Sequence, residues 1–171
     1  MDRRNFKLEI KELDEEQGTF VGYAAVFGNE DLAGDVIEPG AFQKTLQENA
    51  RIPILWQHDA REPIGVTLEA AEDKRGLLVK GKLVLESVRG REAYALLKAG
   101  AIKGLSIGFD TVKWAMDKTI RRLQEIRLWE WSLVTFPANP LAEVTAVKAD
   151  EQKTPEEQPT SSPGEEKAGR V

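Results

Sequence analysis

Apolar and polar residues alternate along many short segments of the chain, which is the pattern of β-strands with one buried face. Near the start, Phe6, Leu8 and Ile10 alternate with charged residues, and a second β-rich run after a turn-prone stretch would pair with them as a hairpin. Strands are predicted at residues 6–10, 19–27, 52–58, 64–70, 77–85, 104–114, 119–129 and 130–135. Residues 28–40 are rich in Gly and Asp, which predicts a loop.

Two segments follow helical spacing instead. The apolar residues between positions 41 and 50 recur at intervals of one turn, and residues 88–98 follow Ser87, a candidate N-cap. Lys98 lies in the last turn of that second segment and Gly100 just past its end, as is common at a helix C-terminus. The chain therefore predicts a mixed, mainly β fold with flanking helices, most economically a β-barrel or a strongly bent sheet.

Length and composition indicate one globular domain and a tail. The 171 residues are 41% hydrophobic and 31% charged, which suits a single well-packed domain at residues 1–148. Residues 149–171 hold six acidic and three basic residues, three prolines and no large apolar residue before the final valine. Such a segment buries too little apolar surface to offset its ordering entropy, so we expect a disordered, acidic, Pro/Ser-rich tail.

The composition also excludes several classes of site. The absence of cysteine removes disulfides and thiolates, and a single histidine removes every metal site built from several histidines. Of the net charge of −5, the tail carries −3, and no basic stretch offers a surface for nucleic acid. No apolar run is long enough to span a membrane, and the first residues lead into no signal-type stretch. We expect no nucleic-acid partner, no membrane and a cytoplasmic protein.

Ser106 is the first candidate for chemistry. In the run from Gly104 to Asp110, the alternation places Gly104, Ser106 and Gly108 on one face of the strand. A glycine inside a strand marks a place where another backbone or a ligand comes close. The glycines fit either a serine exposed to a peptide carbonyl or a bulge or tight strand crossing within a barrel.

His58 and Glu130 are the other two candidates. His58 ends an apolar run in which Ile54 and Trp56 share its face, and a half-buried imidazole is a natural general base near neutral pH. A serine nucleophile needs a base, and this chain has one histidine to offer. Glu130 lies between two tryptophans in an apolar strand, where it either faces solvent or is buried and needs a partner.

Strand geometry narrows the choice of the acid that would orient His58. If the strand continues through Asp59, that side chain points to the opposite face from His58. Asp110 shares a face with Ser106 but lies four residues away, too far for a compact triad. Glu130, on a different strand, is the remaining candidate.

Five segments in order carry a resemblance to a known family. They read Gly22-Tyr23-Ala24-Ala25-Val26-Phe27; Asp31 to Pro39-Gly40-Ala41-Phe42; Trp56-Gln57-His58 with Pro63-Ile64-Gly65; Gly104-Leu105-Ser106-Ile107-Gly108-Phe109; and Glu130-Trp131-Ser132-Leu133-Val134-Thr135-Phe136-Pro137-Ala138-Asn139-Pro140. Together they closely resemble the prohead (capsid maturation) serine proteases of tailed phages, over about residues 6–148. Trp131 is bulkier than the small aliphatic residue expected at its position.

The resemblance implies a β-barrel of the herpesvirus-protease (assemblin) type that acts as a serine endopeptidase during procapsid maturation. It implies Ser106 as the nucleophile, His58 as the general base and Glu130 as the third member, with no cofactor. The oxyanion would be held by backbone N–H groups, with the segment around Asn139 as a candidate. The implied substrates are scaffold protein or the scaffolding segment of the major capsid protein, and the protease itself, inside the procapsid in the host bacterial cytoplasm. A homo-oligomer stays open.

Two other interpretations remain at this point. The first is a non-enzymatic capsid-assembly or scaffold protein that keeps the protease fold and uses the acidic tail as an interaction arm. The second is a hydrolase whose metal is held by Asp31, Asp35 and His58, although the loop acids are better explained by turn chemistry.

Overall fold

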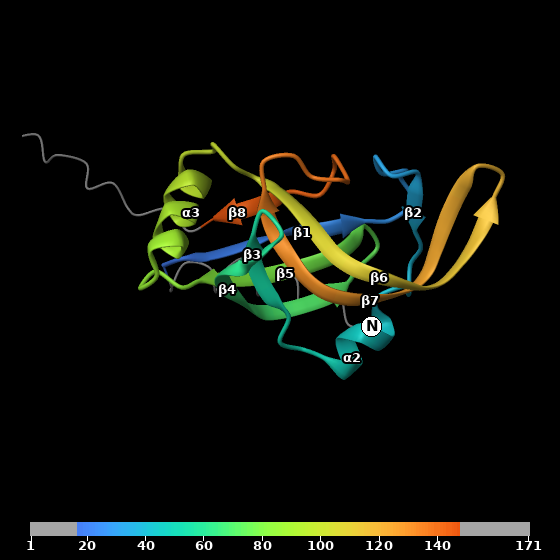
Figure 1. Cartoon of the computed structure of the whole chain (residues 1–171), viewed down its shortest axis with the longest axis horizontal. Coiled ribbons are helices and arrows are strands. Elements are labelled where there is room, and N and C mark those ends of the chain that lie inside the picture. The colour runs from blue at the N-terminus through green and yellow to red at the C-terminus, as the bar shows by residue number, and fades with distance from the viewer. Residues whose placement is uncertain (1–16, 148–171) are drawn as a thin grey trace, which may run out of the picture.

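The computed structural model describes residues 17–147, which form one eight-stranded sheet with two helices (Figure 1). The expected strand at residues 6–10 and the expected tail at residues 149–171 lie outside the described residues. The strands are β1 (Thr19–Val26), β2 (Asp35–Ile37), β3 (Pro53–Trp56), β4 (Asp59–Glu72), β5 (Gly76–Leu83), β6 (Gly104–Asp117), β7 (Ile120–Val134) and β8 (Val144–Val147). The helices are α2 (Gln43–Glu48) and α3 (Val88–Lys98).

The sheet closes into a barrel. Its strand order is β2-β7-β3-β4-β5-β1-β8, and β6 pairs with β7 along its whole length. Closure comes from the start of β6, where Leu105 N donates to Ala142 O (3.0 Å) and Val144 N donates to Lys103 O (2.8 Å), next to β8. The mainly β, barrel-type fold expected from the sequence is confirmed.

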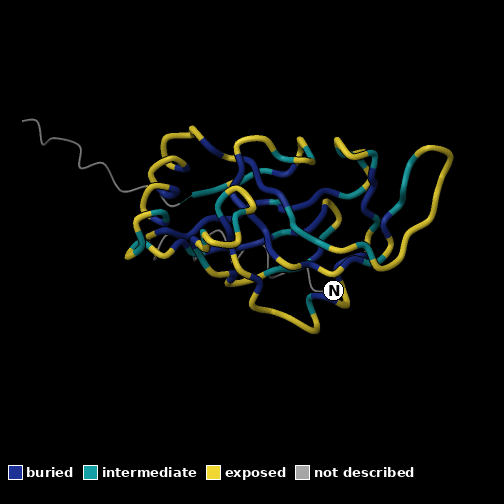
Figure 2. Tube along the Cα trace, viewed as in Figure 1, coloured by how far each residue is buried: buried dark blue, intermediate teal, exposed yellow. Residues whose placement is uncertain are grey.

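The interior of the barrel is apolar and tightly filled. Phe20 on β1 and Trp131 on β7 are fully buried, with ring centroids 5.5 Å apart. Figure 2 shows that burial is concentrated in the barrel, while the far end of the β6–β7 hairpin extends beyond it and is exposed. No helix in the described range of residues 17–147 is long and apolar enough to cross a membrane.

Strand β7 is one continuous strand, whereas the sequence predicts two strands at residues 119–129 and 130–135. The strand continues past residue 129 through a β-bulge. Gly108 of β6 pairs with Glu130 and Phe109 pairs with Leu128, which leaves Trp129 without a partner. An extra residue reverses the order in which side chains face inward. Leu128 and Trp131 can therefore both face the core while Trp129 stays 54% exposed, and the interrupted alternation looked like a strand boundary.

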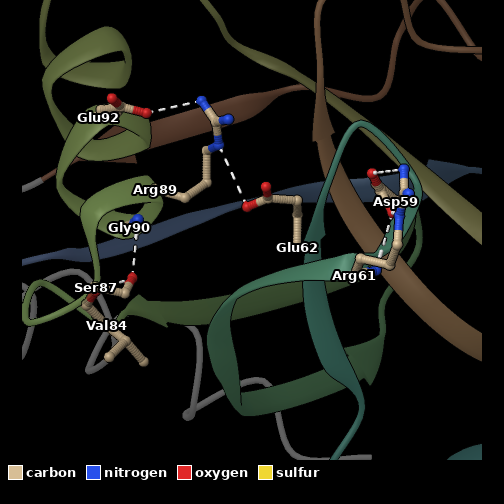
Figure 3. A network of polar contacts seen from close by, with 8 residues as sticks. All are labelled: Asp59, Arg61, Glu62, Val84, Ser87, Arg89, Gly90 and Glu92. Carbon is tan, nitrogen blue, oxygen red and sulfur yellow. Dashed lines mark hydrogen bonds and ion pairs between the residues drawn. The ribbon is translucent and has the colours of Figure 1, made fainter.

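The helices follow their predictions to different degrees. Helix α3 spans the predicted residues, and the Ser87 hydroxyl accepts the Gly90 N–H at 3.0 Å as its N-cap (Figure 3). Helix α2 is shorter than expected, because the backbone becomes extended at Asn49 and leaves Ala50 exposed outside the helix. Within the predicted loop at 28–40, residues Asp35–Ile37 form β2 by pairing in parallel with β7.

The packing around Gly81 predicts a large loss of stability for Gly81→Ala. A Cβ at this position would lie 2.6 Å from Ile54 Cδ1, 2.7 Å from Trp131 Cη2 and 2.9 Å from Phe20 Cζ. We expect the substitution to lower the free energy of unfolding by about 1–3 kcal/mol, the usual effect of overpacking a core. Urea denaturation of both proteins would measure this, and an unchanged midpoint would mean that the three side chains rearrange without loss.

Candidate functional site

The candidate residues of β6 and β7 lie on the outer face of the barrel. Ser106 pairs with Ser132, and Gly108 pairs with Glu130, across the two strands. Because side chains alternate along a strand, all four lie on the face opposite to the fully buried Trp131. The bulk of Trp131 is thus taken up inside the core, away from Glu130.

His58 reaches this face from a turn, not from a strand. The expected strand at residues 52–58 is wrong at its end, because β3 stops at Trp56 and the chain reverses into β4 at Asp59. Gln57 and His58 form the two-residue turn, with φ angles of 51° and 60°. Backbone bonds fix the turn against β7: Gln57 N donates to Leu133 O (3.0 Å), and His58 N donates to the Ser132 hydroxyl (3.1 Å).

The His58 imidazole and the Glu130 carboxylate form a hydrogen bond. His58 Nδ1 bonds Glu130 Oε1, and the Ser132 hydroxyl donates to Glu130 Oε2 at 2.6 Å. Glu130 is only 8% exposed, so both oxygens of a nearly buried carboxylate are paired. This hydrogen bond raises the pKa of His58 above its ordinary value of 6.5, while burial of the ring acts in the opposite direction.

Ser106 lies beside this pair but is not bonded to it. Its residue is 6% exposed, and within residues 17–147 its hydroxyl has no hydrogen bond to His58 or Glu130. It lines a pocket of about 30 Å³ together with Ala138 and Asn139. The Asn139 side chain donates to Asn29 and accepts the Leu141 N–H, so it holds this loop in place.

The two glycines flanking Ser106 make room for the protein's own atoms. A Cβ on Gly108 would lie 2.2 Å from Glu130 Oε1, so only glycine leaves space for the carboxylate. A Cβ on Gly104 would lie 2.7 Å from Val134 O and 2.9 Å from Pro137 Cδ. The close approach that glycines in a strand indicate is therefore real here, and at Gly108 it concerns a candidate site residue.

The other acids near the site have different partners. Asp59 accepts two hydrogen bonds from the Arg61 guanidinium, each at 3.1 Å (Figure 3), and these hold its pKa below the usual range. Asp110 lies opposite Arg127 in the β6–β7 pair. The chain bends at His58, so the assumption that the strand continues through Asp59 is wrong, yet Glu130 is the carboxylate that meets the imidazole.

The three residues considered for a metal do not converge. One Asp31 oxygen accepts the N–H groups of Ala33 (2.8 Å) and Asp35 (3.0 Å), which is turn chemistry. Asp35 is paired with Arg121 through two bonds of 2.7 and 2.6 Å. Among residues 17–147 no group of three metal-ligating side chains comes together.

Ser132 also belongs to this site, although the sequence analysis assigned it no role in orienting His58 or Glu130. It is fully buried, and its hydroxyl contacts both His58 and Glu130. The available signal was its spacing of two from Glu130, which places both side chains on one face of the strand. A hydroxyl beside a buried carboxylate is a natural hydrogen-bond donor.

Comparisons with known proteins agree on one family. Residues 5–157 match the profile of the Caudovirus prohead serine protease family. The chain is 38% identical over 141 residues to the prohead protease of Enterobacteria phage HK97, covering 80% of this chain and 63% of that protein. It is 31% identical over 138 residues to the prohead protease of Escherichia phage T5, covering 76% and 65%.

A third relative has a different printed name. The chain is 36% identical over 151 residues to the capsid polyprotein of Pseudomonas phage PAJU2, covering 83% of this chain and 22% of that protein. The chain thus spans just under two thirds of the length of the HK97 and T5 proteins and about a fifth of the polyprotein.

Among solved structures, the fold is similar to KSHV protease in complex with a hexapeptide phosphonate inhibitor. The TM-score is 0.51 at 16% sequence identity, covering 75% of this chain and 64% of that one. At this identity the likeness is one of fold, and it confirms the herpesvirus-protease type of barrel. On the match of residues 5–157 and the relatives above, the chain belongs to the Caudovirus prohead serine protease family.

Proposed function

We propose that this chain is a serine endopeptidase with Ser106 as nucleophile, His58 as general base and Glu130 as the residue that orients the imidazole. One observation carries the proposal: the chain's only histidine is hydrogen-bonded to a nearly buried carboxylate on the strand that pairs with Ser106. An adjacent base activates a serine, and a carboxylate behind the base fixes its tautomer. No cofactor is needed for this chemistry.

The hydrogen bond at Nδ1 decides which nitrogen acts as the base. With the Nδ1 proton donated to Glu130, the lone pair of neutral His58 lies on Nε2. As the Ser106 oxygen bonds to the substrate carbonyl carbon, Nε2 takes the hydroxyl proton. The carbonyl oxygen becomes an oxyanion, and Glu130 stabilises the imidazolium.

The second half of the reaction returns that proton. When the peptide C–N bond breaks, the imidazolium gives its Nε2 proton to the leaving amine, and Ser106 remains as an acyl ester. A water molecule then attacks the ester while Nε2 takes a proton from the water. The proton passes back to Ser106, which releases the new carboxyl end and restores the enzyme.

Two pockets along β6 support a path for a substrate peptide past Ser106. The small pocket beside Ser106 is walled by Ala138 and Asn139, and backbone N–H groups of this loop would hold the oxyanion. A larger apolar pocket of about 320 Å³ opens at the start of β6, lined by Gly104 and Phe136 among others. A peptide that crosses Ser106 would place an apolar side chain there.

The proposed substrates are the scaffold protein or the scaffolding segment of the major capsid protein, and the protease itself. Family membership supports a role in capsid maturation. The relative named capsid polyprotein supports a capsid protein as partner. Only 22% of that polyprotein matches this chain, so most of the polyprotein lies outside the protease-like part. Cleavage would then take place inside the assembling procapsid, within the host bacterium.

Ser106→Ala is expected to abolish processing and keep the fold. The serine lies 6% exposed next to a small pocket, so losing its hydroxyl leaves no cavity of consequence. The chain would be co-expressed with a candidate major capsid protein, and discrete fragments would be followed on a gel. Ser87→Ala is the matched control, since that hydroxyl caps α3 away from the site. Fragments that persist in Ser106→Ala would contradict the nucleophile assignment, and no processing even by the wild type would favour a scaffold role.

Activity is expected to rise with pH through one ionisation whose midpoint lies above 6.5. His58 must be neutral to accept the serine proton, and its hydrogen bond to Glu130 raises the pKa at which it becomes neutral. Glu130→Gln should move this midpoint down toward 6.5 and lower kcat/KM by about 10²–10⁴-fold, as for other triad acids.

The measurement is a pH profile of peptide cleavage. Asp59→Asn and Asp110→Asn serve as controls, because these acids face arginines instead of His58. A loss in Asp59→Asn as large as in Glu130→Gln would move the orienting role to Asp59.

A further inference from the structure

The Ser132 hydroxyl is shared between the two partners of the His58–Glu130 pair. Its oxygen accepts the backbone N–H of His58 at 3.1 Å, and its proton is donated to Glu130 Oε2 at 2.6 Å. Ser132 itself is fully buried on β7. One side chain on a central strand therefore contacts both the turn that presents the imidazole and the carboxylate that binds it.

Each of these two contacts restrains a group that could otherwise change conformation. The first contact restrains the Glu130 carboxylate. The Glu130 side chain has several rotatable bonds, and its Oε1 can meet the imidazole only while the carboxylate keeps one orientation. The donor to Oε2 fixes that orientation, because a carboxylate held at both oxygens cannot rotate without losing a bond. A nearly buried oxygen left without a donor would be strongly unfavourable.

The second contact restrains the turn. Gln57 and His58 both have positive φ angles, a conformation that residues other than glycine adopt at a cost. The His58 N–H points at Ser132, so the hydroxyl ties the second of these residues to β7. The Ser132 hydroxyl oxygen thus fixes the position of both the turn that carries the imidazole and the carboxylate.

Ser132 is poorly suited to be a nucleophile. Its proton is already donated to Glu130, its oxygen already accepts from His58, and none of its surface is exposed. Ser106 differs in all three respects, since its hydroxyl has no hydrogen bond within residues 17–147, and the residue is 6% exposed and lines a pocket.

We propose that Ser132 is a positioning residue whose single hydroxyl sets the orientation of both His58 and Glu130. This inference rests on the proposed function for its catalytic meaning. The alignment of His58 with Glu130 can be measured whether or not the chain cleaves a peptide.

The charges around His58 make its titration a clean report of this alignment. Glu130 on β7 is the acid bonded to the ring. On β4, Asp59 is bonded to Arg61, and from α3 Arg89 pairs with Glu62 of β4 and with Glu92. Because the chain has one histidine, imidazole signals in an NMR spectrum need no assignment between residues.

The test is Ser132→Ala in the full chain, followed by NMR titration of His58 and by peptide-cleavage kinetics. Without the hydroxyl, the carboxylate turns away from Nδ1. The pKa of His58 should then fall toward 6.5, and the downfield signal of an Nδ1 proton bound to a carboxylate should disappear. We expect kcat to fall while KM stays nearly constant, because the substrate contacts are untouched. Ser132→Thr, which keeps a hydroxyl, should retain the wild-type titration.

An unchanged pKa of His58 in Ser132→Ala would overturn the proposal, even if kcat fell. A raised pKa would also overturn it, because it would mean that the hydroxyl only weakens Glu130 as an acceptor and leaves the geometry intact. If the alanine variant fails to fold, Ser132→Cys keeps a similar volume with a weak donor and should shift the titration in the same direction.

Two further variants calibrate the measurement. Gly108→Ala displaces the Glu130 carboxylate directly, since its Cβ would lie 2.2 Å from Oε1, and it should reproduce the fall in the pKa of His58. Ser87→Ala removes a hydroxyl that is hydrogen-bonded to Val84 and Gly90 and not to the site residues, and it should leave the titration unchanged. Since NMR detects the pair without substrate, a chain that cleaves nothing would refute the proposed function while the titration still decides the role of Ser132.

Discussion

The pairing of β7 with β3 and β6 is the contact on which both the barrel and the site depend. Strand β7 takes β6 along one edge, and β2 and then β3 along the other. The same fifteen residues send Trp131 into the core and Glu130 outward. His58 follows β3 directly and Ser106 lies on β6, so the strand that joins the two halves of the barrel also brings three distant segments of sequence together.

Burying a carboxylate on this outer face sets the residues around it. Glu130 is nearly buried, and an unpaired charge there would be strongly destabilising. The imidazole takes one oxygen and Ser132 takes the other, while Gly108 provides the space. Gly108, Ser132 and His58 thus each meet a requirement of the nearly buried Glu130 carboxylate: space, a hydroxyl donor and an imidazole partner.

Features that depend on neighbouring residues could be predicted from the sequence, and features that depend on distant strands could not. Helix α3 and its Ser87 cap depend on neighbouring residues, as does the alternation that places Gly104, Ser106 and Gly108 on one face. The bulge at Trp129 depends on the partner strand and broke the apparent period of β7. The turn at Gln57 and His58 lacks the Asn-Gly signal of tight hairpins, so the neighbouring residues do not indicate that the strand ends at Trp56.

That missing turn signal has a physical explanation in the contacts that hold the turn. A two-residue hairpin with positive φ at both positions ordinarily selects Asn or Gly, which adopt this conformation with little strain. Here Gln57 donates its N–H to Leu133 and exchanges two side-chain bonds with Thr135, while His58 bonds Ser132 and Glu130. Glycine at position 58 would relax the backbone and remove the imidazole. The strain is retained because tertiary hydrogen bonds offset it, and the strained turn directs the chain's one histidine at the nearly buried Glu130 carboxylate, on the strand that pairs with Ser106.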